Sequence, residues 1–229
     1  MNLGNNLQYL RRMMNRMTQE ELAERMGVSR QTVSKWELDT ATPELEKLVE
    51  LAKLFNVSLD ELINGDMDTD DEHYFNIRAE VLKPMDYAMY GVLSIEPEDD
   101  AIAHVKKWVE NCGDNDPKII GWDLPILSQE QINVYRMHGY AAAWVIPEGA
   151  NTENLPAEIH HQQEQKYIAI SIKEPFTAPF RLIPGGYKTL MDYMKVNGIE
   201  GAAGDFIDCF EYSYIKDGTE YMDVYIAVK

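Results

Sequence analysis

Seven consecutive residues near the N-terminus bring together basic, amide and hydroxyl side chains. Residues 29–35 read Ser-Arg-Gln-Thr-Val-Ser-Lys, and on a helix that buries Val33 none of the outward-facing side chains is acidic. Amide and guanidinium groups can pair with base edges, whereas hydroxyl and ammonium groups suit phosphate oxygens. The candidate DNA-contacting residues on this face are Ser29, Arg30, Gln31, Thr32, Ser34 and Lys35.

A second candidate is a carboxylate within an apolar, aromatic stretch. Residues 207–214 read Ile-Asp-Cys-Phe-Glu-Tyr-Ser-Tyr, and strand alternation puts Glu211 on the face of Ile207 and Cys209. A carboxylate on an inward face must be paired, hydrogen-bonded or reserved for a ligand. Ring faces and a partly desolvated carboxylate suit flat or lipophilic cations. A purely structural role for Glu211 remains the alternative.

Charge is distributed unevenly along the 229 residues, whose net charge is −18. Residues 1–36 hold six basic and three acidic side chains, whereas residues 66–229 hold 13 basic and 29 acidic ones. A polyanion can approach the first segment and is repelled by the second. This asymmetry predicts two domains with different partners.

The N-terminal residues 1–65 show helical periodicity throughout. Thr18 begins a capping-box sequence, Gly27 provides a tight turn, and Ser29 caps the helix that carries the candidate DNA-contacting residues. Residues 66–73 hold a run of acids with little to bury, which predicts a solvated linker. Its Asp-x-Asp-x-Asp spacing lacks the glycine and distal glutamate of a calcium loop, so we expect no metal there.

Residues 74–229 alternate short β-rich runs with two amphipathic segments. They predict two versions of one unit, each with two strands, a helix and a hairpin, related by a pseudo-twofold axis. The first comprises 76–82, 87–90, 99–111, 119–124 and 140–146; the second comprises 167–173, 180–183, 187–197, 206–211 and 221–226. His160 and His161 lie between the units in a polar segment, for which we expect a solvated loop.

The N-terminal motif TQEELAERMGVSRQTVSKWE, followed by a proline and a leucine-rich helix, resembles the Xre family of lambda and Cro repressor-like DNA-binding domains. The resemblance covers about residues 4–64. It implies a five-helix domain that binds double-stranded DNA as a homodimer, and it adds Gln19 to the DNA-contacting residues. Use of the helical pair for protein contact alone remains the alternative.

The C-terminal part is similar to the GyrI-like effector-binding domains. The resemblance rests on Phe210-Glu-Tyr212, the closing residues 222–229, Gly139-Tyr140 with the following Trp144, and Pro184-Gly-Gly-Tyr187. It implies two strand-helix-strand-strand units around a cleft that binds lipophilic or cationic small molecules, including several drugs. The implied ligand-binding residues are Glu211, Trp144, Tyr187 and Tyr140, with Trp122, Asp123 and Tyr90 from the equivalent half, and Tyr214, where the chain, as at Asp123, departs from the family pattern.

These features together favour a cytoplasmic, ligand-responsive bacterial transcription regulator with an α-helical domain followed by an α/β domain. We expect no enzyme activity, no cofactor, no membrane span, and two reduced, mostly buried cysteines. Two alternatives remain. Some GyrI-like proteins resemble hydrolases of electrophilic natural products, for which Glu211 would be the base, and an acidic domain can bind a protein such as gyrase or a toxin.

Overall fold

The computed structural model describes residues 2–67 and 72–229, so part of the predicted acidic linker lies outside the described residues. The chain forms two compact units. The first contains Met1–Glu72 and Tyr187–Glu200, and the second contains His73–Gly186 and Gly201–Lys229. The sequence instead places residues 187–200 in the C-terminal domain, and the domain boundaries inferred from it remain a prediction.

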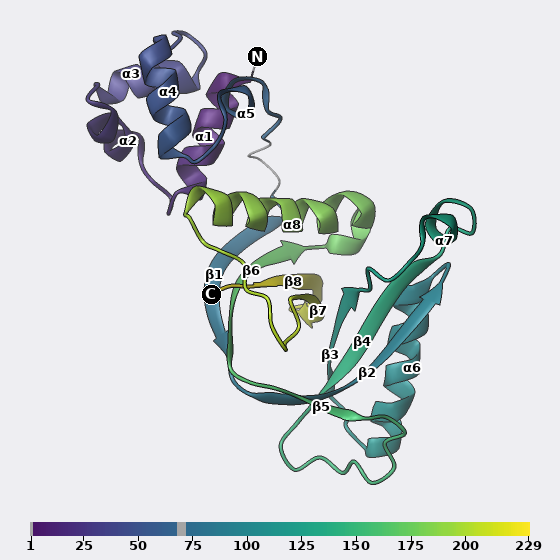
Figure 1. Ribbon diagram of the computed structural model, residues 1–229. Helices are drawn as coiled ribbons and strands as arrows, with labels where there is room; N and C mark the ends of the chain where they lie inside the picture. Colours follow the sequence, from purple (N-terminus) through teal and green to yellow (C-terminus); the bar gives the residue numbers. More distant parts are fainter. Residues whose placement is uncertain (1, 68–71) are drawn as a thin grey trace. The chain divides into compact units, whose positions relative to one another are not determined.

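Five short helices make up the described N-terminal part of the first unit (Figure 1). They are α1 (Leu3–Met13), α2 (Gln19–Met26), α3 (Arg30–Glu37), α4 (Leu45–Leu54) and α5 (Leu59–Asn64). Polar caps start three of them. Thr18 and Ser58 form complete capping boxes with the glutamates three residues on, and the Ser29 hydroxyl accepts the Thr32 amide at the start of α3. Gly27 ends α2 at φ 64°.

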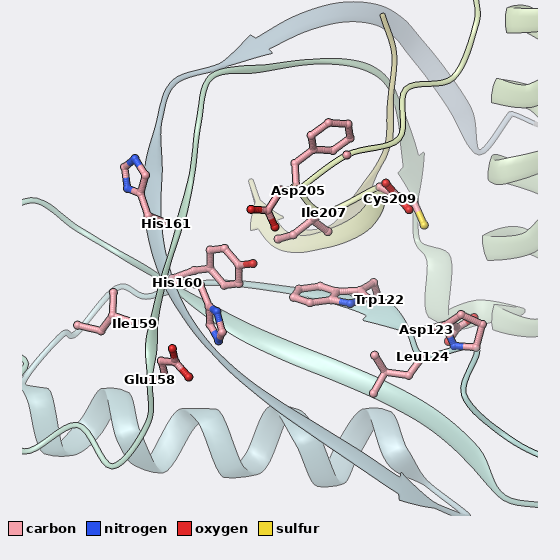
Figure 2. A pocket seen from close by; sticks show the side chains of 15 residues that line it. Trp122, Asp123, Leu124, Glu158, Ile159, His160, His161, Asp205, Ile207 and Cys209 are labelled. Atoms are coloured by element: carbon pink, nitrogen blue, oxygen red, sulfur yellow. The ribbon is translucent and has the colours of Figure 1, made fainter.

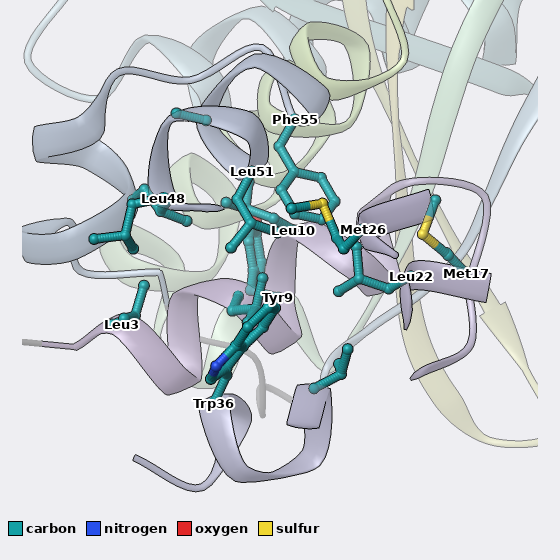
Figure 3. Close-up of a cluster of buried hydrophobic side chains, with 14 of the residues drawn as sticks. Leu3, Tyr9, Leu10, Met17, Leu22, Met26, Trp36, Leu48, Leu51 and Phe55 are labelled. Carbon is teal, nitrogen blue, oxygen red and sulfur yellow. The ribbon is translucent and has the colours of Figure 1, made fainter. Parts of the chain in front are cut away.

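Apolar side chains from all five helices meet in one core (Figure 3). Leu7, Leu22, Leu51 and Phe55 have no exposed surface, and Trp36 is 4% exposed. These side chains come from α1, α2, α3 and α4 with its C-cap, so the core holds α2 and α3 at their mutual angle. That angle leaves the outer side of α3 uncovered within this unit.

The second unit is built on one antiparallel sheet, which has eight strands in the described residues. Its strands are β1 (Tyr74–Leu82), β2 (Met85–Ser94), β3 (Lys118–Asp123), β4 (His138–Ile146), β5 (Ile159–Gln162), β6 (Gln165–Lys173), β7 (Cys209–Lys216) and β8 (Thr219–Ala227). The order across the sheet is β1-β6-β8-β7-β3-β4-β2-β5. The helical elements after residue 73 are α6 (Pro97–Cys112), α7 (Gln129–Asn133), the 3-10 turn η1 (Pro175–Thr177) and α8 (Pro179–Val196), and α8 belongs to the first unit from Tyr187 onward.

The repeated strand-helix-strand-strand order is confirmed: β2-α6-β3-β4 is followed by β6-α8-β7-β8. The strand predicted at residues 180–183 is wrong, because these residues form the first turns of α8. This part of α8 lies against β1 and β6, where the Tyr74 hydroxyl donates to the Leu182 carbonyl oxygen at 2.8 Å. A Cβ at Gly185 would clash with that hydroxyl, so only glycine lets α8 approach Tyr74 this closely. Helix propensity alone disfavours glycine at this position.

Successive side chains on the central strands face opposite sides of the sheet. On β4, Ala142 and Trp144 pack in the same cluster as Val105 of α6, whereas Ala143 packs in a different cluster with Tyr167 and Phe210. The sheet therefore has an α6 face and an opposite face with its own aromatic cluster. Figure 1 shows α6 running along β2, β3 and β4.

The two halves of the sheet join through a short seam between β3 and β7. The register there is Ile120 with Tyr212 and Gly121 with Glu211. In comparison, β2 and β4 pair from Asp86 to Ser94. Glu211 thus lies where the two repeated units meet.

Segment 159–162, predicted as a solvated loop, is a strand. β5 pairs with the start of β2, with His160 opposite Tyr87 and His161 opposite Asp86. The imidazole of His161 contacts the Asp86 carboxylate, Nδ1 to Oδ1, at 2.6 Å. Strand pairing at a sheet edge overrode the polar composition, which in isolation is typical of a loop.

Candidate functional sites

The outer side of α3 presents the predicted DNA-contacting side chains. Arg30, Gln31 and Lys35 are exposed, and among the described residues these three side chains have no hydrogen-bond or ion-pair partner. Ser29 and Thr32 are linked, with 2.9 Å between their hydroxyl oxygens. Ser34 is partly exposed. A helix that offers unpaired amide, guanidinium and ammonium groups has the donors needed to contact base edges and phosphates.

Gln19, at the start of α2, is held by a buried ion pair. Its Nε2 donates to Glu37 Oε2 at 2.8 Å, and Arg11 donates to the same carboxylate through Nε at 2.6 Å and Nη2 at 3.1 Å. The side chains of Arg11 and Glu37 are 11% and 2% exposed. The network links α1, the start of α2 and the end of α3, so it fixes the orientation of α3.

Glu211 lines a cavity of about 270 Å³ on the α6 face of the sheet. The wall comes from α6 through Ile102 and Lys106, from β3 through Gly121, from β4 through Tyr140, from η1 through Phe176, and from β7 through Glu211 and Ser213. We call this cavity the Glu211 cleft. It combines one carboxylate, one ammonium group, one phenol and apolar surface.

The phenol and the carboxylate of the Glu211 cleft contact each other. Tyr140 OH donates to Glu211 Oε2 at 3.3 Å, and Tyr140 is 6% exposed. Burial, and then the charge of Glu211, raises the pKa of Tyr140 above its usual value. Tyr140 therefore stays a neutral donor at physiological pH.

Two of the other predicted ligand residues pack against α6, Trp144 in the core and Tyr90 partly exposed. Trp144 has no exposed surface, and its Nε1 donates to Asp114 Oδ2 at 2.9 Å. The Tyr90 ring stacks on His104 with 3.8 Å between centroids. Neither residue lines the Glu211 cleft. The resemblance to the GyrI-like domains implies that both rings line the cleft, whereas in this chain both pack against α6.

The remaining predicted residues are spread over other surfaces. Trp122 and Asp123 line a separate cavity, and Tyr214 donates to Asp223 Oδ1 at 3.3 Å while stacking between Tyr212 and Tyr221. Tyr187 belongs to the segment grouped with the first unit. The structure thus divides the predicted set: Tyr140 and Glu211 line one cavity, and Trp122 and Asp123 line another.

Sequence reasoning missed Lys106 and Phe176 in the Glu211 cleft. Lys106 lies on the exposed side of α6, as the helical periodicity predicts, and Phe176 lies in a short turn whose sequence matches no motif. The expectation of mostly buried cysteines is also inaccurate, since Cys112 and Cys209 are free but partly exposed. No local pattern reports which exposed side chains of a helix border a cavity.

Comparison with known proteins agrees with the helical unit. A helix-turn-helix family model matches residues 7–62. An HTH-type transcriptional regulator of Methanocaldococcus jannaschii, MJ0272, is 40% identical over 60 residues, which cover 89% of that protein and 26% of this chain. The chain belongs to the helix-turn-helix transcriptional regulators. The transcriptional activator BcrR of Enterococcus faecalis is 44% identical to this regulator over 66 residues, 29% of this chain, and the match spans 32% of BcrR.

A solved structure covers both units of this regulator at low similarity. The cryo-EM structure of an EcmrR–DNA complex has 10% sequence identity and a TM-score of 0.48, covering 93% of this chain and 85% of that chain. Among the described residues, no helix is both long and apolar enough to cross a bilayer.

Proposed function

We propose that this regulator binds operator DNA through α3 and changes its DNA affinity when a lipophilic cation occupies the Glu211 cleft. The observation that carries the proposal is the Glu211–Tyr140 pair, a charged acceptor beside a neutral donor within a cavity. The DNA-binding half rests on the helix-turn-helix family and on the unpaired side chains of α3. Two copies would place their recognition helices about 34 Å apart, in successive major grooves.

The roles of the α3 side chains can be separated by comparing two variants. Gln31→Ala is expected to weaken binding to the selected operator by about 1–3 kcal/mol and to leave non-specific binding unchanged, because an amide reads a base edge. Lys35→Ala is expected to weaken both and to reduce the salt dependence, because an ammonium group neutralises a phosphate. Fluorescence anisotropy on operator and scrambled duplexes measures both effects. Equal losses for Gln31→Ala on the two duplexes would contradict base reading.

Charges around the Glu211 cleft predict which ligands it accepts. Glu211 attracts a cation at the floor of the cleft, and Lys106 opposes it from the α6 wall. Ile102, Phe176 and the ring of Tyr140 supply the apolar contacts that hold an organic body. A compact cation with one aromatic ring fits this combination better than a highly charged one.

Benzyltrimethylammonium is a suitable probe for these two charges. Glu211→Gln is expected to weaken its binding by roughly tenfold, and Lys106→Met is expected to tighten it, because the two substitutions remove charges of opposite sign. Isothermal titration calorimetry measures both. Two changes in the same direction would show that packing, and not charge, determines affinity for this cleft.

The helix α8 offers a path from the cleft to the DNA-binding unit. Phe176 of the cleft precedes α8, and the residues of α8 from Tyr187 onward belong to the first unit. Within that unit Tyr9 OH donates to Asp192 Oδ2 at 2.9 Å, and Asn197 Nδ2 donates to the Met13 carbonyl oxygen at 2.9 Å. A ligand that favours one position of α8 would therefore act on α1, within the limit set by its differential affinity for the two states.

Operator binding with and without benzyltrimethylammonium tests the regulatory half. The proposal expects a ligand-dependent shift in the operator Kd that disappears in Glu211→Gln, while the ligand-free Kd of that variant stays unchanged. If the ligand binds but the operator Kd does not change, DNA binding by this regulator is independent of the ligand. Turnover of an electrophilic ligand, lost in Glu211→Gln, would instead favour a hydrolase, with Glu211 as the base.

A further inference from the structure

A second cavity, of about 610 Å³, lies in the second unit and is distinct from the Glu211 cleft. Figure 2 shows Asp205 and Ile207 on one side, Glu158 and His160 on the other, and Trp122 beside them. We call it the Trp122 pocket. It is large enough for a small organic molecule.

The two cavities open on opposite faces of the sheet. Trp122 and Tyr87 pack in the same cluster as Ala143, on the face away from α6, whereas Tyr140 and Ala142 pack with α6. The neighbouring positions Gly121 and Trp122 on β3 therefore belong to different cavities. A molecule in the Trp122 pocket does not contact Glu211.

Aromatic rings form a continuous wall of the Trp122 pocket. The Tyr87 ring stacks on His160 with 5.3 Å between centroids, and it meets Trp122 edge-on at 6.4 Å. These three rings come from β2, β5 and β3, so strand pairing fixes their spacing. Rings held in this way present π faces to a cation without further ordering cost.

Carboxylates outnumber the basic groups around the pocket. Asp123, Glu158, Asp205 and Asp208 line it beside His160 and His161, and none of the lining residues, all of which are described, is lysine or arginine. Asp205 and Tyr87 line the same pocket, and burial, and then the charge of Asp205, raises the pKa of Tyr87. The pocket therefore favours positive ligands and disfavours anions.

Buried hydrogen bonds hold the loop that carries Asp205 and Asp208. Gln162, 1% exposed, accepts the Ile207 amide through Oε1 at 3.0 Å, and Tyr167 OH donates to the Ile207 carbonyl oxygen at 2.8 Å. Gln162 Nε2 also donates to Tyr167 OH at 3.1 Å. Ile207 lies between the two aspartates, so these bonds hold the backbone that carries both exposed side chains.

From these observations we infer that the Trp122 pocket is a second binding site, for an aromatic organic cation whose ring lies against Trp122 and Tyr87 and whose charge faces Asp205. The inference does not depend on the Glu211 cleft or on DNA binding. It assigns Asp205 and Trp122 the roles of charge and ring recognition.

N-methylquinolinium and quinoline form a matched pair of probes, since they share a ring system and differ in charge at pH 8. The full-length protein is expected to bind the cation roughly tenfold more tightly than the neutral ring, with a preference that weakens as salt is raised. Quenching of the Trp122 fluorescence, identified by its loss in Trp122→Phe, reports binding at this pocket. Asp205→Asn keeps the side-chain shape and is expected to remove most of the preference for the cation.

Glu211→Gln is the control, because it alters only the other cavity. Unchanged quenching in Glu211→Gln, together with reduced affinity in Asp205→Asn, would support the second site. Equal binding of the cation and the neutral ring would overturn it. Loss of the Trp122 signal in Glu211→Gln but not in Asp205→Asn would also overturn it, because the probe would then bind in the Glu211 cleft alone.

Discussion

At the scale of single residues, Glu37 shows how a buried charge is tolerated in the helical unit. Its carboxylate accepts hydrogen bonds from Arg11 and Gln19 at 2.6–3.1 Å, so desolvation is compensated by three donors. Removing one partner of such a pair leaves the other charge buried without compensation. The functional consequence concerns α3, whose last residue is Glu37.

Glu37→Ala is expected to destabilise the protein by about 3–5 kcal/mol, because it leaves the Arg11 guanidinium buried without a carboxylate partner. The double variant Arg11→Met with Glu37→Leu is expected to lose much less, since it removes both charges and keeps the volume. Urea unfolding followed by circular dichroism compares the two. Equal losses in the single and double variants would show that packing, and not charge compensation, makes Glu37 important.

At the scale of elements, β3 accommodates Tyr140 only because residue 121 has no side chain. A Cβ at Gly121 would clash with the Tyr140 hydroxyl and lie 2.5 Å from the ring carbon Cζ. Gly121→Ala is expected to cost about 1–3 kcal/mol of stability and to displace Tyr140 from Glu211. Gly91→Ala on β2 is the matched control, because its Cβ would meet only the flexible Leu124 side chain, at 3.0 Å. Similar unfolding midpoints for the two variants would contradict this account.

Sequence signals were most informative for elements whose ends are decided locally. Thr18 and Ser29 mark the starts of α2 and α3, because a hydroxyl cap acts on amides two or three residues away. The sequence does not predict the start of α8, because Pro184 and Gly185 disfavour a helix, and the close contact of Gly185 with Tyr74 is a long-range feature. Strand β5 exists through pairing with β2, which is a long-range contact.

At the scale of the whole molecule, several phenols are ionised with difficulty in the folded state. Burial is the main cause that raises the pKa of Tyr140 and Tyr225 above their usual values, and it raises the pKa of Tyr167 to about 12. In the unfolded chain these groups ionise near pH 10, as free tyrosine does (about 10). Their contribution to stability is therefore complete below about pH 10 and is lost as the pH rises further.

An alkaline titration tests this expectation. The free energy of unfolding should fall steeply above about pH 10, and native-state absorbance of tyrosinate should show some of the 13 tyrosines ionising only as the protein unfolds. Urea titrations at increasing pH give the stability. Ionisation of all tyrosines in one step near pH 10, without loss of structure, would contradict the burial of these phenols.

The sequence predicts only part of the ligand site, because it does not show which face of the sheet a helix covers. Alternation points to Glu211 alone, and the resemblance to the GyrI-like domains adds Tyr140, which contacts Glu211 in the structure. Neither signal separates these residues from Trp144, which shares the α6 face of β4 with Tyr140 but has no exposed surface and does not line the cleft. The two signals also could not show that Trp122 faces the opposite side from Glu211, because the β3–β7 register is set by pairing between residues far apart in the sequence.

The short seam between β3 and β7 has a consequence for how ligand preference can change. The carboxylate comes from one repeated half, and Ile102, Lys106 and Tyr140 come from the other. Because only two residue pairs join the halves there, Ile120 with Tyr212 and Gly121 with Glu211, substitutions on α6 can reshape one wall without altering the strand that carries the charge. Mutational libraries confined to α6 should therefore yield variants that prefer a different organic cation but still bind cations more tightly than neutral molecules.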